Sequence, residues 1–156
     1  MKKVFKFFVS ILFCLAAGFF GSIFTTPSIP TWYAALNKPF FTPPNWLFAP
    51  AWTTLFILMG IALFLVWIKG FKKKEVKGAM LFFLIQLILN VAWSFYFFYW
   101  KTPFWALIDI IILWFFILLT LIQFWKINKT AGALLIPYLL WVSFASLLNY
   151  SVWKLN

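Results

Sequence analysis

The side chains that usually carry chemistry are scarce in this chain, and their scarcity narrows the reactions it can perform. It has no histidine and a single cysteine, Cys14, and its only acidic residues are Glu75 and Asp109. Zinc ligation and serine–histidine or cysteine–histidine catalysis are therefore not expected, and we predict no metal site. A mechanism with two cooperating carboxylates is equally disfavoured. Any catalysis would have to come from tryptophan, tyrosine or a bound cofactor.

Aromatic residues at helical spacing offer a different kind of site. Five of them are candidates for the interior of a helix bundle: Trp52, Phe56, Trp93, Phe97 and Trp141. The polar groups that accompany them are few: Tyr33, Gln86, Asn90, Asp109 and Asn149. Apolar walls with a few polar groups fit a site for a flat hydrophobic ligand. Aromatic stripes are also typical of any packed membrane bundle, so plain interior packing is the competing interpretation.

The composition shows which environment must position these residues. Hydrophobic residues make up 66% of the 156 residues and charged residues only 10%, whereas a soluble domain is about a quarter charged. We therefore expect an integral membrane protein. The net charge of +11 does not indicate nucleic-acid binding, because arginine is absent and most lysines flank the apolar runs.

The apolar runs predict an all-α membrane protein with five transmembrane helices in a single domain, residues 1–156. We expect the helices at about 5–25, 46–68, 78–100, 103–125 and 131–153. A cleaved signal peptide is the alternative for the first run. That run is about 18 residues long, which favours a retained helix.

A lid loop, residues 26 to 45, is expected between the first two helices. It contains Pro39, Pro43 and Pro44, and proline fixes φ and lacks an N–H, so the segment should be a shaped loop and not a span. Its aromatic residues suit a membrane interface. Pro50 is expected in the first turn of the next helix, and Pro137 is expected to bend the last one.

Polar residues inside the spans should face protein or a cavity. Gln86 and Asn90 share one face of the third helix, either for interhelical hydrogen bonds or for a ligand. Asp109 should have a partner or be neutral; Asn90, Gln86 or a backbone group are the candidates. Cys14, Ala17, Gly18 and Gly21 form a stripe of small residues on the first helix, which allows close packing inside the bundle or at a dimer contact.

The lysines predict the orientation. With five spans, ten lysines lie on the side of the N-terminus, and three, Lys38, Lys101 and Lys154, lie on the other. The positive-inside rule then places the N-terminus in the cytoplasm and the lid outside, for a protein of the cytoplasmic membrane.

Three stretches of the sequence resemble one known family. They are WYAALNKPFFTPPNWLFAPAWTTLFILMGIA from Trp32, NVAWSFYFF from Asn90 and IPYLLWVSFASLLNYSVWKLN from Ile136. They resemble the lid, second, third and fifth helices of the TspO/MBR family, the tryptophan-rich sensory or translocator proteins. The resemblance covers residues 30 to 156. It implies a five-helix bundle, usually a homodimer, that binds porphyrins and synthetic isoquinoline or benzodiazepine-type ligands under the lid without a required cofactor.

The resemblance also implies roles for individual residues. The ligand-binding positions are Tyr33, Pro43, Trp52, Phe56, Asn90, Trp93, Trp141, Ala145 and Asn149. Apart from the resemblance, the polar residues Gln86 and Asp109 inside the spans are candidates for polar support of the site. In some members, the tryptophans matching Trp52 and Trp141 are needed for porphyrin breakdown. A loose sterol pattern matches Leu148, Tyr150 and Lys154, where the family usually has an arginine in place of the lysine. Phe41 stands where many members have a lid tryptophan.

Three functions follow as hypotheses. The first is a porphyrin-binding sensor or carrier. The second is an enzyme that degrades porphyrin with light and oxygen, in which Trp52 and Trp141 quench the excited ring and form radicals. The third is a transporter or a structural partner of other membrane proteins, although no internal repeat is apparent.

Overall fold

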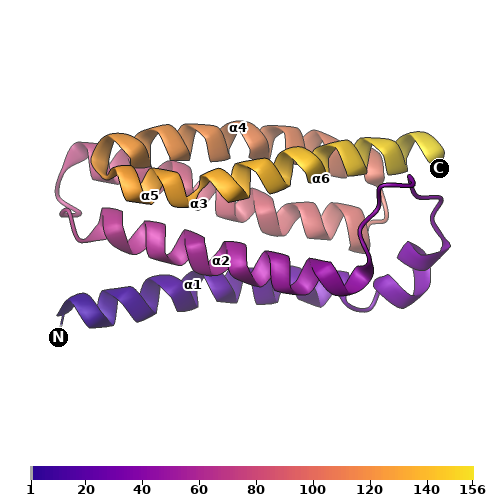
Figure 1. Cartoon of the computed structure of the whole chain (residues 1–156), viewed down its shortest axis with the longest axis horizontal. Coiled ribbons are helices and arrows are strands. Elements are labelled where there is room, and N and C mark those ends of the chain that lie inside the picture. The colour runs from indigo at the N-terminus through magenta and orange to yellow at the C-terminus, as the bar shows by residue number, and fades with distance from the viewer. Residues whose placement is uncertain (1) are drawn as a thin grey trace.

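The computed structural model describes residues 2–156 and consists of helices running side by side along one long axis (Figure 1). The elements are α1 (Lys2–Thr25), η1 (Ile29–Tyr33), α2 (Asn45–Trp67), α3 (Lys74–Ser94), η2 (Phe95–Tyr99), α4 (Pro103–Ile127), α5 (Lys129–Leu134) and α6 (Ile136–Leu155). η1 and η2 are single π-helical turns.

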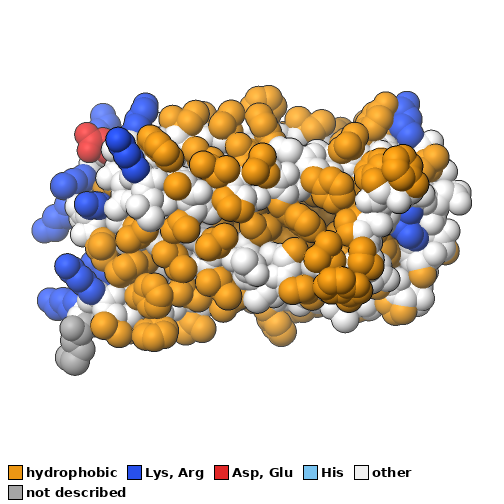
Figure 2. Space-filling model, in the orientation of Figure 1, with side chains coloured by type: hydrophobic (Ala, Val, Ile, Leu, Met, Phe, Trp, Pro, Cys, Tyr) orange, Lys and Arg blue, Asp and Glu red, His pale blue; other side chains and the backbone are white. Residues whose placement is uncertain are grey.

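The prediction of an all-α protein with five transmembrane helices is confirmed. Within residues 2–156, five helical stretches are long and apolar enough to cross a membrane: Lys2–Thr25, Asn45–Trp67, Lys74–Tyr99, Pro103–Ile127 and Lys129–Leu155. Apolar side chains cover the middle of the visible face, and lysines gather at the end that carries the N-terminus (Figure 2). This is a multi-pass integral membrane protein.

Some helix boundaries differ from the expected ones. α1 begins at Lys2 and α3 begins at Lys74, so both helices extend into lysine-rich segments that were expected outside the spans. Lysine is a good helix former, and Glu75 in the first turn of α3 complements the helix dipole. Pro50 is the sixth residue of α2, past the first turn, so it leaves the carbonyl of Trp46 without its helical donor. Trp46 lies at the lid end and is 72% exposed.

The fifth span is divided as Pro137 led us to expect. α5 ends at Leu134 and α6 begins at Ile136, with Leu135 as the junction. Proline at position 137 cannot donate to the carbonyl four residues earlier, so the helix bends there. α5 packs closely against α4: Gly132 leaves no room for a side chain, since an added Cβ would lie only 2.7 Å from Cα of Trp125.

The lid is more ordered than a simple loop. It contains η1, and the amine of Lys38 donates to the carbonyl oxygens of Tyr33 at 2.8 Å and Leu36 at 3.1 Å. The far end of the chain holds it as well: the Asn37 N–H donates to Oδ1 of Asn156 at 3.0 Å, and Nδ2 of Asn156 donates to the carbonyl of Asn37 at 2.8 Å. The lid is therefore tied to the last residue of the chain across the end of the bundle.

α1 packs inside its own bundle along α2 and α3. Cys14 is fully buried, a Cβ at Gly18 would lie 2.7 Å from the Phe56 ring, and one at Gly21 would lie 3.2 Å from Oγ of Ser94. Of the two interpretations of the small-residue stripe, the structure uses packing within the chain.

Candidate ligand-binding site

A cavity of about 350 Å³ lies beneath the lid, between α1, α2, α3, η2 and α6. Volumes of this size are typical of small-molecule sites. We call the end of the cavity farthest from the lid its deep end. α3 and α6 run from the lysine end toward the lid and α2 runs the other way, so the deep end is formed by Phe56, Asn90 and Trp141. Ile29 and Tyr33 line the cavity on the lid side.

Most of the residues predicted from the sequence line this one cavity. They are Tyr33, Trp52, Phe56, Asn90, Trp93, Trp141, Ala145, Asn149, Phe97 and Leu148. They come from the lid, α2, α3, η2 and α6, so segments far apart in the chain meet here. Their role in binding a ligand stays a prediction.

Indole and phenyl rings form the walls. Trp52 and Trp141 lie with ring centroids 6.4 Å apart and planes at 87°, and Trp52 also lies 5.8 Å from Phe56. Perpendicular rings of this kind stabilise one another through their quadrupoles. The result is a pair of large apolar surfaces at right angles, a shape that suits a flat ligand packed against either ring.

The polar groups of two predicted site residues, Trp93 and Asn149, already have partners within the protein. Nε1 of Trp93 donates to Oδ1 of Asn149 at 2.9 Å, and Nδ2 of Asn149 donates to the carbonyl of Pro103 at 2.8 Å. These bonds join α3, α4 and α6 beside the cavity. Asn149 thus positions the Trp93 ring, and its amide has its main partners before any ligand arrives.

Gln86 lies below the cavity and does not line it. Its Oε1 accepts from the Tyr138 hydroxyl at 2.7 Å, and that hydroxyl accepts from Nδ2 of Asn90 at 2.7 Å. Both amides were predicted to make either interhelical bonds or ligand contacts, and Asn90 does the first while also lining the cavity.

Asp109 was expected either to be neutral or to bond to Asn90, Gln86 or a backbone group, and the two amides are not its partners, since Asn90 bonds to Tyr138 and Gln86 bonds to Tyr138 and Met59. Asp109 is buried on α4, outside the cavity lining, and its Oδ2 has no hydrogen-bond partner within residues 2–156. The two amides instead turn toward α6 and α2, where Tyr138 and Met59 are their partners.

Pro43 and the sterol pattern are dispersed. Pro43 does not line the cavity, so it can act only through the shape of the lid. Leu148 is buried and faces the cavity, whereas Tyr150 and Lys154 are exposed, with the Lys154 amine 4.5 Å from the centroid of the Trp153 ring. Tyr150 and Lys154 share the exposed face, with the Lys154 amine 6.0 Å from the centroid of the Tyr150 ring, whereas Leu148 faces the cavity, so the three sterol-pattern residues do not lie on one face.

Tyr33 lies in the lid, outside the spans, and is the best-buried of its aromatic residues. It packs 5.8 Å from Phe98, and burial raises the pKa of its phenol above the ordinary value. The phenol therefore stays neutral around pH 7 and offers a hydroxyl at the lid end of the cavity. Within residues 2–156, no group of three histidine, cysteine, aspartate or glutamate side chains could hold a metal ion.

The sequence-based prediction missed Tyr138 and the α1 wall. Tyr138 precedes Trp141, Ala145 and Asn149 by three, seven and eleven residues, so helical spacing places it on the same face and could have identified it. The α1 wall includes Leu15, Gly18 and Ser22, and its only signal was the small-residue stripe. Phe41 packs 6.2 Å from Phe144, a cavity residue, and so connects the lid to α6.

Comparison with known proteins agrees with the resemblance found in the sequence. Residues 10–154 match the model of the TspO/MBR family. The chain is 48% identical over 155 residues to the protein named Tryptophan-rich protein TspO of Chlorobaculum tepidum, covering 99% of this chain and 98% of that one. It is 39% identical over 140 residues to the human protein named Translocator protein, covering 88% of this chain and 82% of the human one. The chain therefore belongs to the TspO/MBR family, and this membership supports a role as a membrane sensor or binding protein.

Proposed function

We propose that this protein binds a porphyrin or a similar flat hydrophobic molecule in the cavity under the lid, as a sensor or carrier. The observation that carries the proposal is the cavity of about 350 Å³ that is walled by Trp52, Trp141 and Phe56 and lined mostly by apolar side chains. A planar apolar ring gains most of its binding free energy from such surfaces. Binding of this kind needs no resident cofactor.

Titration with protoporphyrin IX in detergent, in the dark, tests the proposal through quenching of tryptophan fluorescence. Saturable quenching is expected, and Trp141→Ala should weaken the affinity by about tenfold, since a buried aromatic contact contributes at least 1.4 kcal/mol. The matched control is Trp46→Ala, because Trp46 is exposed and lies outside the cavity lining. Quenching that does not saturate would overturn the proposal.

Degradation of the bound porphyrin is a second candidate, favoured by the perpendicular pair of Trp52 and Trp141 in the cavity wall. Either indole can quench a photo-excited ring by electron transfer, and oxygen would serve as the oxidant. Illumination of the complex in air should then give a new absorbing product that Trp141→Phe abolishes while binding persists. A stable porphyrin spectrum would exclude the enzyme and leave the binding protein.

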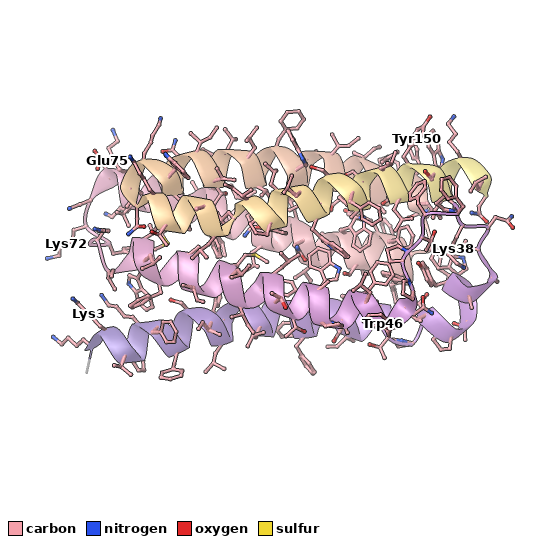
Figure 3. The ribbon with its side chains drawn as sticks, in the orientation of Figure 1. Lys3, Lys38, Trp46, Lys72, Glu75 and Tyr150 are labelled. Carbon is pink, nitrogen blue, oxygen red and sulfur yellow. The ribbon has the colours of Figure 1, made fainter. Side chains whose placement is uncertain are left out.

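The orientation is part of the proposal. Lys3, Lys72 and Glu75 lie at one end of the bundle, while Lys38, Trp46 and Tyr150 lie at the other (Figure 3). The lysine-rich end should face the cytoplasm and the lid the opposite side. Cys14 is buried and is the single cysteine, so Cys14→Ser gives a cysteine-free background. Lys72→Cys and Asn37→Cys are then introduced into it one at a time. An impermeant maleimide applied to intact cells should label only position 37; labelling only at 72 would reverse the topology.

The homodimer implied by the family resemblance is also proposed, and its interface would use lipid-facing side chains. Many large apolar residues are exposed on the surface of the single chain, including Phe19 on α1, Ile88 on α3 and Leu140 on α6. Light scattering of the detergent complex should give twice the protein mass of 18.4 kDa. A protein mass of one chain at all concentrations would reject the dimer.

A further inference from the structure

A chain of buried polar groups lies directly beneath the cavity. Nε2 of Gln86 donates to Sδ of Met59 at 3.8 Å, the Tyr138 hydroxyl donates to Oε1 of Gln86 at 2.7 Å, and Nδ2 of Asn90 donates to the same hydroxyl at 2.7 Å. All four residues are buried, and they connect α2, α3 and α6. Asn90 is the only one of the four that reaches the cavity.

Met59, the residue of this hydrogen-bonded series farthest from the cavity, sets the direction of all its bonds. A thioether sulfur can accept a hydrogen bond and cannot donate one. Gln86 therefore turns its NH₂ group toward Met59 and its oxygen toward Tyr138. The opposite arrangement would place two acceptors, the amide oxygen and the sulfur, against each other in a buried site.

Tyr138 transmits this direction to Asn90. A phenol has one proton, and Tyr138 gives it to Gln86, so its oxygen can only accept from the next residue. Asn90 must then turn its Nδ2 toward Tyr138. The amide oxygen of Asn90 makes no hydrogen bond to any residue from 2 to 156, and Asn90 lines the cavity.

We infer that the deep end of the cavity presents a fixed hydrogen-bond acceptor, Oδ1 of Asn90, that selects ligands with an N–H or O–H donor there, and that Tyr138 is the residue positioning it. This inference rests on the proposed function, because it concerns the polarity of the same site. The neighbouring amide cannot compensate, since Asn149 is already bonded to Trp93 and Pro103.

A fixed acceptor at Asn90 constrains how a ligand lies in the cavity. An ionised carboxylate or a bare carbonyl oxygen would face another acceptor at Asn90, and the donor it would have to reach instead is the buried Nε1 of Trp141, which has no partner within residues 2–156. A porphyrin should therefore place an apolar or donor-bearing edge at Asn90. Its carboxylates should lie toward the lid, nearer the Tyr33 hydroxyl.

Three isosteric tricyclic probes test the inference: carbazole with an N–H donor, dibenzofuran with an oxygen acceptor, and fluorene with neither. Each is used to displace protoporphyrin IX from the full chain in detergent. Carbazole should displace it with an affinity about tenfold higher than dibenzofuran, with fluorene between them, because one hydrogen bond is gained and one acceptor clash is avoided. The ratio of the carbazole affinity to the dibenzofuran affinity is the readout, because a general change in cavity shape affects both probes alike and cancels in the ratio.

Tyr138→Phe removes the one hydroxyl that orients Asn90, and the ratio should fall from about tenfold to near one. Tyr96→Phe is the matched control, because Tyr96 lies on η2 outside the cavity lining, and it should keep the ratio. If Tyr138→Phe does not fold, Met59→Leu replaces it: without the sulfur, Gln86 can reverse, and the ratio should again fall toward one.

The outcomes separate the two proposals. If protoporphyrin IX does not bind saturably, the proposed function fails, and this inference fails with it. If porphyrin binds but the three probes displace it equally, or none displaces it, the fixed acceptor is wrong while the binding function stands. An unchanged ratio in Tyr138→Phe, or in Met59→Leu where that variant is the one tested, would show that Tyr138 does not position Asn90.

Discussion

The same helices form a closed core at the lysine end of the bundle and a hollow one at the lid end. At the lysine end, Met59, Ala62, Val66 and Phe83 are almost completely buried, and the Phe83 ring stacks on Phe124 at 5.6 Å with planes 8° apart. At the lid end, the larger Trp52, Trp93 and Trp141 are only partly buried and surround the cavity.

The difference shows that the size of the side chains at the helix crossings decides where a cavity remains inside the bundle. Gly60 and Gly132 allow backbones to touch in the closed half, where an added Cβ would meet a backbone atom at 2.5 Å and 2.7 Å respectively. Ala145 is also small, but it lies in the wall of the cavity, among large rings that leave space unfilled. Glycines therefore bring backbones together in the closed half, whereas Ala145 leaves room in the other.

Filling a helix crossing in the closed half should have the largest effect. Gly60→Val would push a side chain into Cα of Ile11, so α1 must move away from α2. We expect a loss of about 3 kcal/mol in the free energy of unfolding, measured by thermal unfolding in detergent. Gly78→Ala is the control: nothing lies within 4 Å of its added Cβ, so the helix should gain up to about 1 kcal/mol. Equal stability of the two variants would contradict the close packing.

Filling the cavity in the hollow half should weaken binding and leave the fold intact. Ala145→Phe places a ring in the cavity, so porphyrin affinity should fall by at least about tenfold, while the melting temperature stays close to that of the parent. Leu147→Phe on the same helix is the control, because Leu147 is exposed on the outside of the bundle. A large drop in melting temperature for Ala145→Phe would mean that the two halves are packed alike.

Releasing the lid from the end of the chain should change rates more than affinity. Asn156→Ala removes the side-chain bonds to Asn37, and porphyrin should leave about three- to tenfold faster in a stopped-flow displacement. Ser151→Ala removes a similar exposed polar group that bonds only within α6 and should leave the release rate unchanged. An unaltered release rate in Asn156→Ala would show that this tie does not hold the lid.

Softening the lid should have the smallest effect. Pro43 is not one of the residues that line the cavity, so Pro43→Gly should act through added backbone freedom, about 0.4–1 kcal/mol. The release rate should rise about two- to fivefold, and the dark binding curve should keep its shape. A large loss of equilibrium affinity would instead mean that Pro43 contacts the ligand.

Much of the site could be predicted because helical spacing places residues on common faces. Trp52 with Phe56, and Trp141 with Ala145 and Asn149, are read directly from a period of 3.6 residues, and all of them line the cavity. The partners of Gln86 and Asp109 could not be predicted in this way. A helical face indicates a direction, whereas a hydrogen bond depends on which side chain of another helix lies at the same height.

The sequence by itself determined that this chain spans a membrane five times, that it belongs to a known family and which helix faces are aromatic, because these properties depend on composition and on spacing along one segment. Only the tertiary structure decided that Tyr138 joins Gln86 to Asn90, that Asp109 has no amide partner and that Asn156 ties down the lid. The physical reason is that these features depend on residues that lie tens of positions or more apart in the sequence. Whether such residues meet is decided by how the helices pack together.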